Sequence, residues 1–217
     1  MSIFAVFDLD GTLLDTIVDL ADACNYALKK QGFPVHPVNP YKYFVGMGVY
    51  NLIKKALPEE ARSEEIIAAV KADYDSYYSV HSRDKTAPYS GIVEALAALR
   101  ERGVRLAVLS NKPHEYIKPL TDLYFPGIFD ISVGQRENVP TKPDPTAVFE
   151  IMESFGAKKD AGFYIGDTST DMRTGKSAGL YTIGVLWGFR TKDELESHGA
   201  DVIIAEPSEL LKIIVDK

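Results

Sequence analysis

The sequence predicts an α/β protein with a doubly wound parallel sheet and a small helical domain inserted after the first strand. Three observations lead to this fold class. The chain opens with a short apolar run, residues 3–7, that is typical of a buried parallel strand. Further along, strand-length apolar segments alternate with helical patterns, as they do in parallel sheets. Between these parts, residues 15–85 show helical periodicity without a strong strand signal. We therefore expect a core domain of residues 1–14 and 86–217 and a helical domain of residues 15–85.

The helical domain is predicted from two amphipathic segments. The first has apolar side chains at helical spacing: Ile17, Leu20, Ala21, Cys24, Ala27 and Leu28. The second starts after Ser63, a favourable N-cap residue, and carries Ile66, Val70, Tyr74 and Tyr77 on its apolar side. Glycine and proline interrupt the pattern from Gly32 to Gly48. Only these two helices are therefore predicted in the insertion.

The core domain is predicted from apolar periodicity together with start and stop signals. Gly103 stops one helix, and Gly156 ends another whose first residues, Asp144 and Pro145, are read as the N-cap and the first helical position. Thr191 and Glu194 form a capping-box pattern before a short helix. The expected order is helix 91–102, strand 104–111, helix 115–123, strand 131–133, helix 144–156, strand 162–165, strand 181–185, the helix after Thr191, strand 201–204 and helix 208–215.

Composition limits the classes of function. The chain has 217 residues and a formal net charge of −7, whereas nucleic-acid binding calls for a basic surface. Its apolar runs are too short to span a membrane, and its start lacks the pattern of a signal peptide. The single cysteine, Cys24, cannot form an internal disulfide. We expect a cytoplasmic protein with no nucleic-acid or membrane partner.

Two carboxylates follow the first strand with one residue between them. Asp8 and Asp10 come directly after the apolar run, and Gly11 lets the chain turn sharply. Ligands of open α/β sheets bind at this end of the strands. Two like charges in such a place favour a bound cation. A solvated Asp-Gly turn is the alternative interpretation of this segment taken alone.

Four ordered motifs make the chain resemble the haloacid dehalogenase superfamily. The segment Asp8-Leu9-Asp10-Gly11-Thr12 is similar to the nucleophile motif of that family, and the strand ending at Ser110-Asn111 to the second motif. Lys142, before Pro143, fits the third, and the acidic cluster of residues 166–171 fits the fourth. The run of residues 178–189 resembles the phosphoglycolate phosphatase branch. In this family, an insertion such as residues 15–85 is a cap over the active site.

The resemblance implies a Mg²⁺ site and a covalent mechanism. Asp8 is implied as the nucleophile that attacks phosphorus and as a metal ligand, and Asp10 as the general acid and base that also offers its backbone carbonyl to the metal. Asp167 is implied as a further ligand, and Asp171 as a group that orients the metal shell. Hard oxygen ligands of this kind suit Mg²⁺ bound together with a phosphate.

The phosphate-binding residues implied by the resemblance are Thr12, Ser110, Asn111 and Lys142. From the residues alone, other interpretations stay open: Lys142 is read equally well as an exposed lysine, Ser110-Asn111 as a turn, and Asp171 as a helix-start charge.

The expected activity is hydrolysis of a small phosphorylated metabolite, because Asp10 supplies the acid that a leaving ester oxygen needs. The alternatives are a phosphotransferase similar to β-phosphoglucomutase, an inorganic pyrophosphatase, and an inactive binding protein on the same fold. In the insertion, Lys42, Gly46 and Gly48 are candidates for reading the substrate, although Lys42 stands where an Arg is expected. A monomer or a homodimer is expected.

Overall fold

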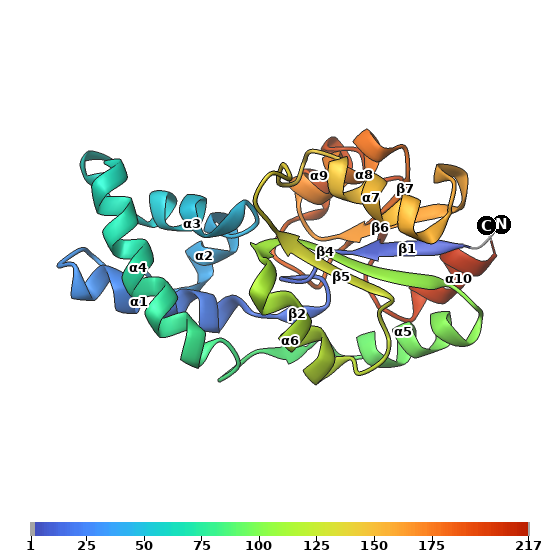
Figure 1. Ribbon diagram of the computed structural model, residues 1–217, viewed down its shortest axis with the longest axis horizontal. Helices are drawn as coiled ribbons and strands as arrows, with labels where there is room; N and C mark the ends of the chain where they lie inside the picture. The colour runs from blue at the N-terminus through green and yellow to red at the C-terminus, as the bar shows by residue number, and fades with distance from the viewer. Residues whose placement is uncertain (1–2, 217) are drawn as a thin grey trace. The chain divides into compact units, whose positions relative to one another are not determined.

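The computed structural model describes residues 3–216 (Figure 1), and these residues divide into two compact units. One unit contains the described residues of 1–14 and 88–217, and the other is Asp15–Ala87. The chain thus returns from the smaller unit to the larger one after residue 87, whereas the sequence predicted this boundary after residue 85. The chain passes between the units at β2 (Leu14–Asp15) and β3 (Ala87–Pro88), which pair as a two-stranded sheet.

The larger unit is built on a six-stranded parallel sheet in the order β5-β4-β1-β6-β7-β8. The first strand is therefore central, and the chain builds outward from it in both directions, which confirms the predicted doubly wound sheet. The strands are β1 (Phe4–Phe7), β4 (Arg105–Pro113), β5 (Ile131–Gln135), β6 (Gly162–Gly166), β7 (Tyr181–Val185) and β8 (Val202–Ile204).

Helices cover both faces of this sheet because alternate strand side chains point to opposite sides (Figure 1). Ala5 and Phe7 pack with side chains of the α5, α6 and α10 helices, whereas Phe4 and Val6 pack with those of α7 and α8. The helices of this unit are α5 (Ile92–Glu101), α6 (His114–Tyr124), α7 (Thr146–Phe155), α8 (Ser169–Ala178), α9 (Lys192–Ser197) and α10 (Glu209–Val215), with a short 3₁₀ turn η2 (Lys159–Ala161).

Two element ends in this unit differ from the prediction. Helix α7 begins at Thr146, with Pro145 in the N-cap position, and not at Pro145 as predicted. The Asp144 carboxylate nevertheless accepts a hydrogen bond from the backbone N–H of Thr146 at 2.9 Å, which is the contact expected of a capping side chain. Strand β4 continues through Pro113, beyond the Ser110-Asn111 pair at which the sequence ended it, because Pro113 pairs with Gln135 of β5 after a shift of register that follows Leu109.

The smaller unit is helical, as predicted, but contains more helices than expected. Its elements are α1 (Ile17–Lys30), α2 (Val38–Phe44), α3 (Gly48–Ala56), the 3₁₀ turn η1 (Glu59–Ala61) and α4 (Glu64–His81). The long helices α1 and α4 pack on each other, and the Ser63 hydroxyl caps α4 as predicted. Prediction missed α2 and α3 because each is short and Gly46, with φ of 117°, separates them. Among residues 3–216, the helices lack the combination of length and apolar character that a membrane-spanning helix requires.

Candidate active site

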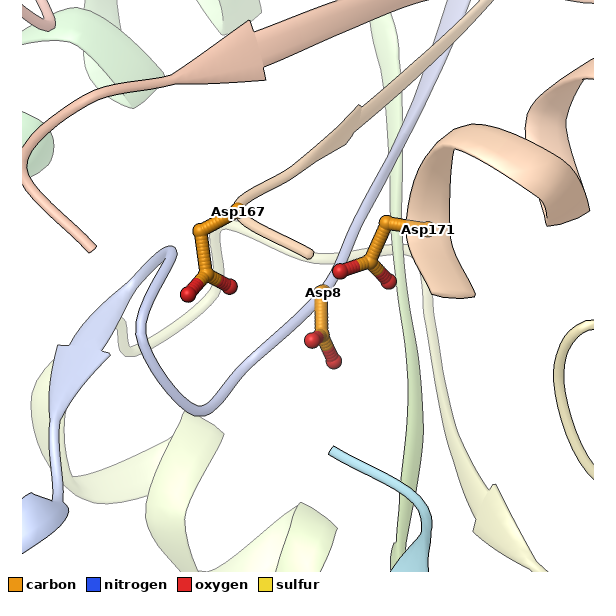
Figure 2. Close-up of side chains that lie close together, drawn as sticks. All are labelled: Asp8, Asp167 and Asp171. Carbon is orange, nitrogen blue, oxygen red and sulfur yellow. The ribbon is translucent and has the colours of Figure 1, made fainter. Parts of the chain in front are cut away.

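Three buried carboxylates meet at the C-terminal ends of the two central strands β1 and β6 (Figure 2). Asp8 directly follows β1, Asp167 directly follows β6, and Asp171 lies in the first turn of α8. Phe7 and Ile165 are paired residues of the two strands, and the backbone N–H of Asp8 donates to the Ile165 carbonyl at 2.9 Å. One oxygen atom from each carboxylate lies within 4.8 Å of the others.

Glycines make room for this cluster. A Cβ atom on Gly166 would lie 2.3 Å from Cβ of Asp171, and one on Gly188 would lie 2.3 Å from Cβ of Asp167. Gly11 has a φ of +88°, and its Cβ would lie 2.4 Å from Oδ2 of Asp167. Sequence analysis singled out only Gly11, since the crowding at the other two depends on where the folded chain places the side chains of Asp171 and Asp167.

Lys142 lies among these carboxylates with only 3% of its side chain exposed. Its Nζ is 2.8 Å from Oδ1 of Asp8 and 2.8 Å from Oδ1 of Asp171, and it donates to the Leu109 carbonyl at 3.2 Å. The interpretation of Lys142 as an exposed lysine is therefore wrong.

Asn111 holds the backbone of this lysine. Its side-chain Oδ1 accepts from the Lys142 N–H at 2.9 Å, and its Nδ2 donates to the Lys142 carbonyl at 3.0 Å. Asn111 is buried beside Ser110, in the C-terminal part of β4. The structure thus gives Asn111 a part in positioning Lys142.

The other two carboxylates are fixed by short polar contacts. Thr168 donates to Oδ2 of Asp171 from its hydroxyl at 2.6 Å and from its backbone N–H at 3.1 Å, so Asp171 closes a capping box at the start of α8. Asp167 accepts from the Thr12 hydroxyl at 3.0 Å and from the backbone N–H of Phe189 at 2.8 Å. Asp171 is therefore both a helix-start charge and a member of the buried cluster.

Asp8 has one oxygen atom engaged and one open. Oδ1 accepts from the backbone N–H of Leu9 at 2.7 Å and contacts Lys142. Within the described residues 3–216, no donor contacts Oδ2 of Asp8. This oxygen is therefore the one available for bond formation or for a cation.

The electrostatics of the cluster are those of a site that lacks positive charge. Three buried carboxylates share one buried ammonium group. Burial and the Asp171 charge raise the pKa of Asp8 to about 7, although Lys142 pulls it down. Burial, with Asp171 and Asp8, raises the pKa of Asp167 well above its usual range. Burial by itself lowers the pKa of Lys142, but Asp171 and Asp8 outweigh it and hold that pKa well above normal. Hard oxygen donors with excess negative charge fit a divalent cation such as Mg²⁺.

Asp10 lies next to this cluster and is paired with a residue that sequence analysis did not identify. Lys112 extends from the last part of β4, and its Nζ lies 3.1 Å and 3.3 Å from the two carboxylate oxygens of Asp10. A lysine two residues after Ser110 on an extended strand points to the same side as that serine. That spacing was the available signal, and it was missed because the strand was ended too early.

The predicted residues of the helical domain lie in the smaller unit. Lys42 is in the last turn of α2 rather than in a loop. Gly46 and Gly48 have φ values of 117° and 80°, which favour glycine, and Gly48 is the first residue of α3. Their part in reading a substrate stays a prediction.

Known proteins resemble the chain over nearly its whole length. A phosphoglycolate phosphatase of Aquifex aeolicus is 37% identical over 211 residues, which cover 96% of this chain and 95% of the relative. A phosphoglycolate phosphatase of Pseudomonas putida is 29% identical, with 95% of this chain and 77% of the relative covered.

Solved structures agree with these sequence relatives. A candidate phosphoglycolate phosphatase of Lactobacillus delbrueckii subsp. bulgaricus has a crystal structure that superimposes with a TM-score of 0.94 at 33% identity, and all of both chains is covered. The family of haloacid dehalogenase-like hydrolases matches residues 5–185. The chain therefore belongs to the haloacid dehalogenase-like hydrolases and is one of the phosphatases of that family.

Proposed function

We propose that the protein hydrolyses a small phosphate monoester in a Mg²⁺-dependent reaction, with 2-phosphoglycolate as the first substrate to test. One observation carries this proposal: three buried carboxylates lie within 4.8 Å of one another and share one lysine. Such a cluster repels a phosphate until a cation compensates its charge. The names of the relatives from Aquifex aeolicus and Pseudomonas putida support the choice of substrate.

Asp8 and Asp167 are the proposed side-chain ligands of Mg²⁺, and the backbone carbonyl of Asp10 is the proposed third protein ligand. Both oxygens of Asp171 are occupied by Lys142 and Thr168, which suits a group that orients its neighbours better than a direct ligand. When bound, Mg²⁺ would neutralise charge on the carboxylates and on the phosphoryl oxygens.

The proposed reaction has two steps. Oδ2 of Asp8 attacks phosphorus as the bond to the ester oxygen breaks, and the Asp10 carboxyl group gives its proton to that oxygen. Water then attacks the phosphorus of the aspartyl-phosphate and gives a proton back to Asp10, which releases inorganic phosphate and restores Asp8. Lys142 and the Ser110 hydroxyl are placed to contact the transferred phosphoryl group.

The helical domain, residues 15–87, is the proposed source of specificity. The residues described above act on the phosphoryl group and not on the rest of the ester, so the ester must be read elsewhere. If Lys42 and the segment containing Gly46 read it, Lys42→Ala and Gly46→Pro change the ratios of kcat/KM among small phosphate esters. Unchanged ratios in both variants would remove this segment from substrate recognition.

The proposal is tested by phosphate release from a panel that contains 2-phosphoglycolate, a sugar phosphate and pyrophosphate. EDTA should abolish release and Mg²⁺ should restore it, while full activity without metal would refute the metal requirement. Asp8→Asn should lower kcat by several orders of magnitude, because members of a catalytic unit are lost together. A folded Asp8→Asn protein with near-normal turnover would exclude the nucleophile role. A phosphorylated organic product in place of inorganic phosphate would indicate a phosphotransferase.

A further inference from the structure

Lys112 is a buried charged residue that the proposed mechanism does not use. Only 3% of its side chain is exposed to solvent, and the side chain of Asp10, which it contacts, is 12% exposed. Its Nζ donates to both carboxylate oxygens of Asp10, at 3.1 Å and 3.3 Å. A buried ammonium group of this kind needs hydrogen-bond acceptors in place of water, so the contact with the Asp10 oxygens contributes to the fold as well as to the orientation of the carboxyl group.

The backbone of Lys112 is fixed on two sides. Its N–H donates to the Ser110 hydroxyl at 3.2 Å. A Cβ atom on Gly134 of β5 would lie 2.4 Å from the carbonyl oxygen of Lys112, so the glycine allows the two strands to come close. Lys112 therefore projects from a backbone that is held in place, at the end of β4 that extends past the last residue of β1.

Asp10, in contrast, lies in a turn. The turn is closed by backbone hydrogen bonds, from Leu13 N–H to the Leu9 carbonyl at 3.0 Å and from Gly11 N–H to the Leu14 carbonyl at 2.9 Å. These bonds fix the path of the chain but do not fix the direction of the Asp10 side chain. The contact that orients the carboxylate comes from Lys112.

We infer that Lys112 is a positioning residue that holds the carboxyl group of Asp10 in place for proton transfer to the leaving oxygen. This inference rests on the proposed function, in which Asp10 gives its proton to the ester oxygen as the bond to phosphorus breaks. Lys112 itself donates no proton and forms no bond in the reaction. Without it, the Asp10 side chain can turn away from the ester oxygen, and a displacement of about 1 Å can lower a rate by about 100-fold.

A double-mutant cycle on folding tests the contact without any assay of activity. Asp10→Asn, Lys112→Met and the double variant are unfolded in urea with EDTA present. The two changes should couple by about tenfold or more in the unfolding equilibrium constant, as contacting residues do. Lys118→Met in α6 serves as the matched control, because its partner Asp122 and its own side chain are both largely exposed. If Asp10 and Lys112 show no coupling, the inference is overturned, whatever the enzyme hydrolyses.

Kinetics then distinguish a positioning role from a structural one. The value of kcat/KM is compared between p-nitrophenyl phosphate, whose leaving group needs no proton, and an alkyl phosphate such as 2-phosphoglycolate, whose leaving group does. Lys112→Met should lower kcat/KM for the alkyl ester by about 10- to 100-fold, as expected when a general acid is misplaced. For the p-nitrophenyl ester the loss should stay below about threefold by the same reasoning.

An equal loss on the two esters would overturn the inference and leave the proposed function intact. A wild-type enzyme that releases no phosphate from any ester would instead refute the proposed function. The Lys118→Met variant should match the wild type on both esters.

Discussion

Lys142→Met removes the lysine ammonium that contacts Asp8 and Asp171, and the substitution should strongly destabilise the metal-free protein. Methionine has nearly the length and shape of the lysine stem but carries no charge. The side chain is 3% exposed, and its Nζ contacts two carboxylates at 2.8 Å. Removal of one partner from a buried ion pair costs about 3–5 kcal/mol, because the remaining charge is left without compensation. We expect a loss near the lower value at pH 7.5, since Asp8, with a pKa raised to about 7, can take up a proton.

The expected loss depends on pH, and the direction follows from proton uptake. Without Lys142, the folded site holds protons more tightly than in the wild type, whereas the unfolded chains differ little. The folded variant thus carries extra protons at neutral pH, and its stability relative to the wild type improves as the pH falls. For one extra proton the difference shrinks by up to about 1.4 kcal/mol for each pH unit.

Urea denaturation followed by tryptophan fluorescence measures this effect. Trp187 is the only tryptophan, and its indole N–H donates to the Thr12 carbonyl at 2.9 Å, so it reports on the same unit as Lys142. The free energy of unfolding is compared at pH 7.5 and 5.5 in EDTA. Lys118→Met, which breaks an exposed pair with Asp122, should change it by less than about 1 kcal/mol. A Lys142→Met loss equal to that of Lys118→Met, or one that does not change with pH, would refute the electrostatic account.

Three further predictions concern the same unit. Gly188→Ala should lower the free energy of unfolding by about 1–3 kcal/mol in urea denaturation, because the new methyl group has no room beside the carboxylates, and an unchanged value would contradict this crowding. The increase in Tm on adding Mg²⁺ should grow from pH 5.5 to 8 in calorimetry, because Asp8 must lose its proton to bind metal, and a constant increase would argue against Asp8 as a ligand. Thr168→Val should lower the free energy of unfolding by about 1–2 kcal/mol. This loss should exceed that of Thr191→Val, because the Thr191 hydroxyl caps the short helix α9 in a more exposed place. Equal losses at the two threonines would show that the contact with Asp171 adds nothing to the cap.

Sequence patterns predicted the sheet well because its signals are local. Each strand of the core is a short apolar run, and each neighbouring helix has its own periodicity and stop signal, such as Gly103 or Gly156. The position of Asp8 and Asp167 at strand ends followed from the same patterns. What these patterns do not contain is the spacing between strands. The need for glycine at Gly188 arises from its contact with Asp167 on another strand end, and the need at Gly166 arises because α8 turns the side chain of Asp171 back toward β6. Both became visible only in the folded chain.

Lys112 and Lys142 show the same limit for charged residues. Because lysine side chains are usually exposed, the sequence around a lysine gives no sign that it is buried unless its partner is known. Lys142 was identified through the resemblance to a family, not through its neighbours in the chain. Lys112 was missed because the polar residues before Pro113 look like a turn, whereas β4 runs through them to Pro113, which pairs with Gln135 of β5.

The arrangement of charges explains why the same residues that bind a ligand also limit the stability of the metal-free fold. Asp8, Asp167 and Asp171 are held by hydrogen bonds from the sheet ends and from α8, so they cannot move apart to relieve their repulsion. Lys142 compensates one of the three charges, and Lys112 is already engaged with Asp10. At low pH, bound protons compensate the remaining negative charge, and the pKa of Asp8 is accordingly raised to about 7. At higher pH a divalent cation can take their place, and its binding then adds to the stability of the folded state. On this reasoning, affinity for Mg²⁺ and stability of the metal-free protein should change in opposite directions whenever a residue of the cluster is neutralised.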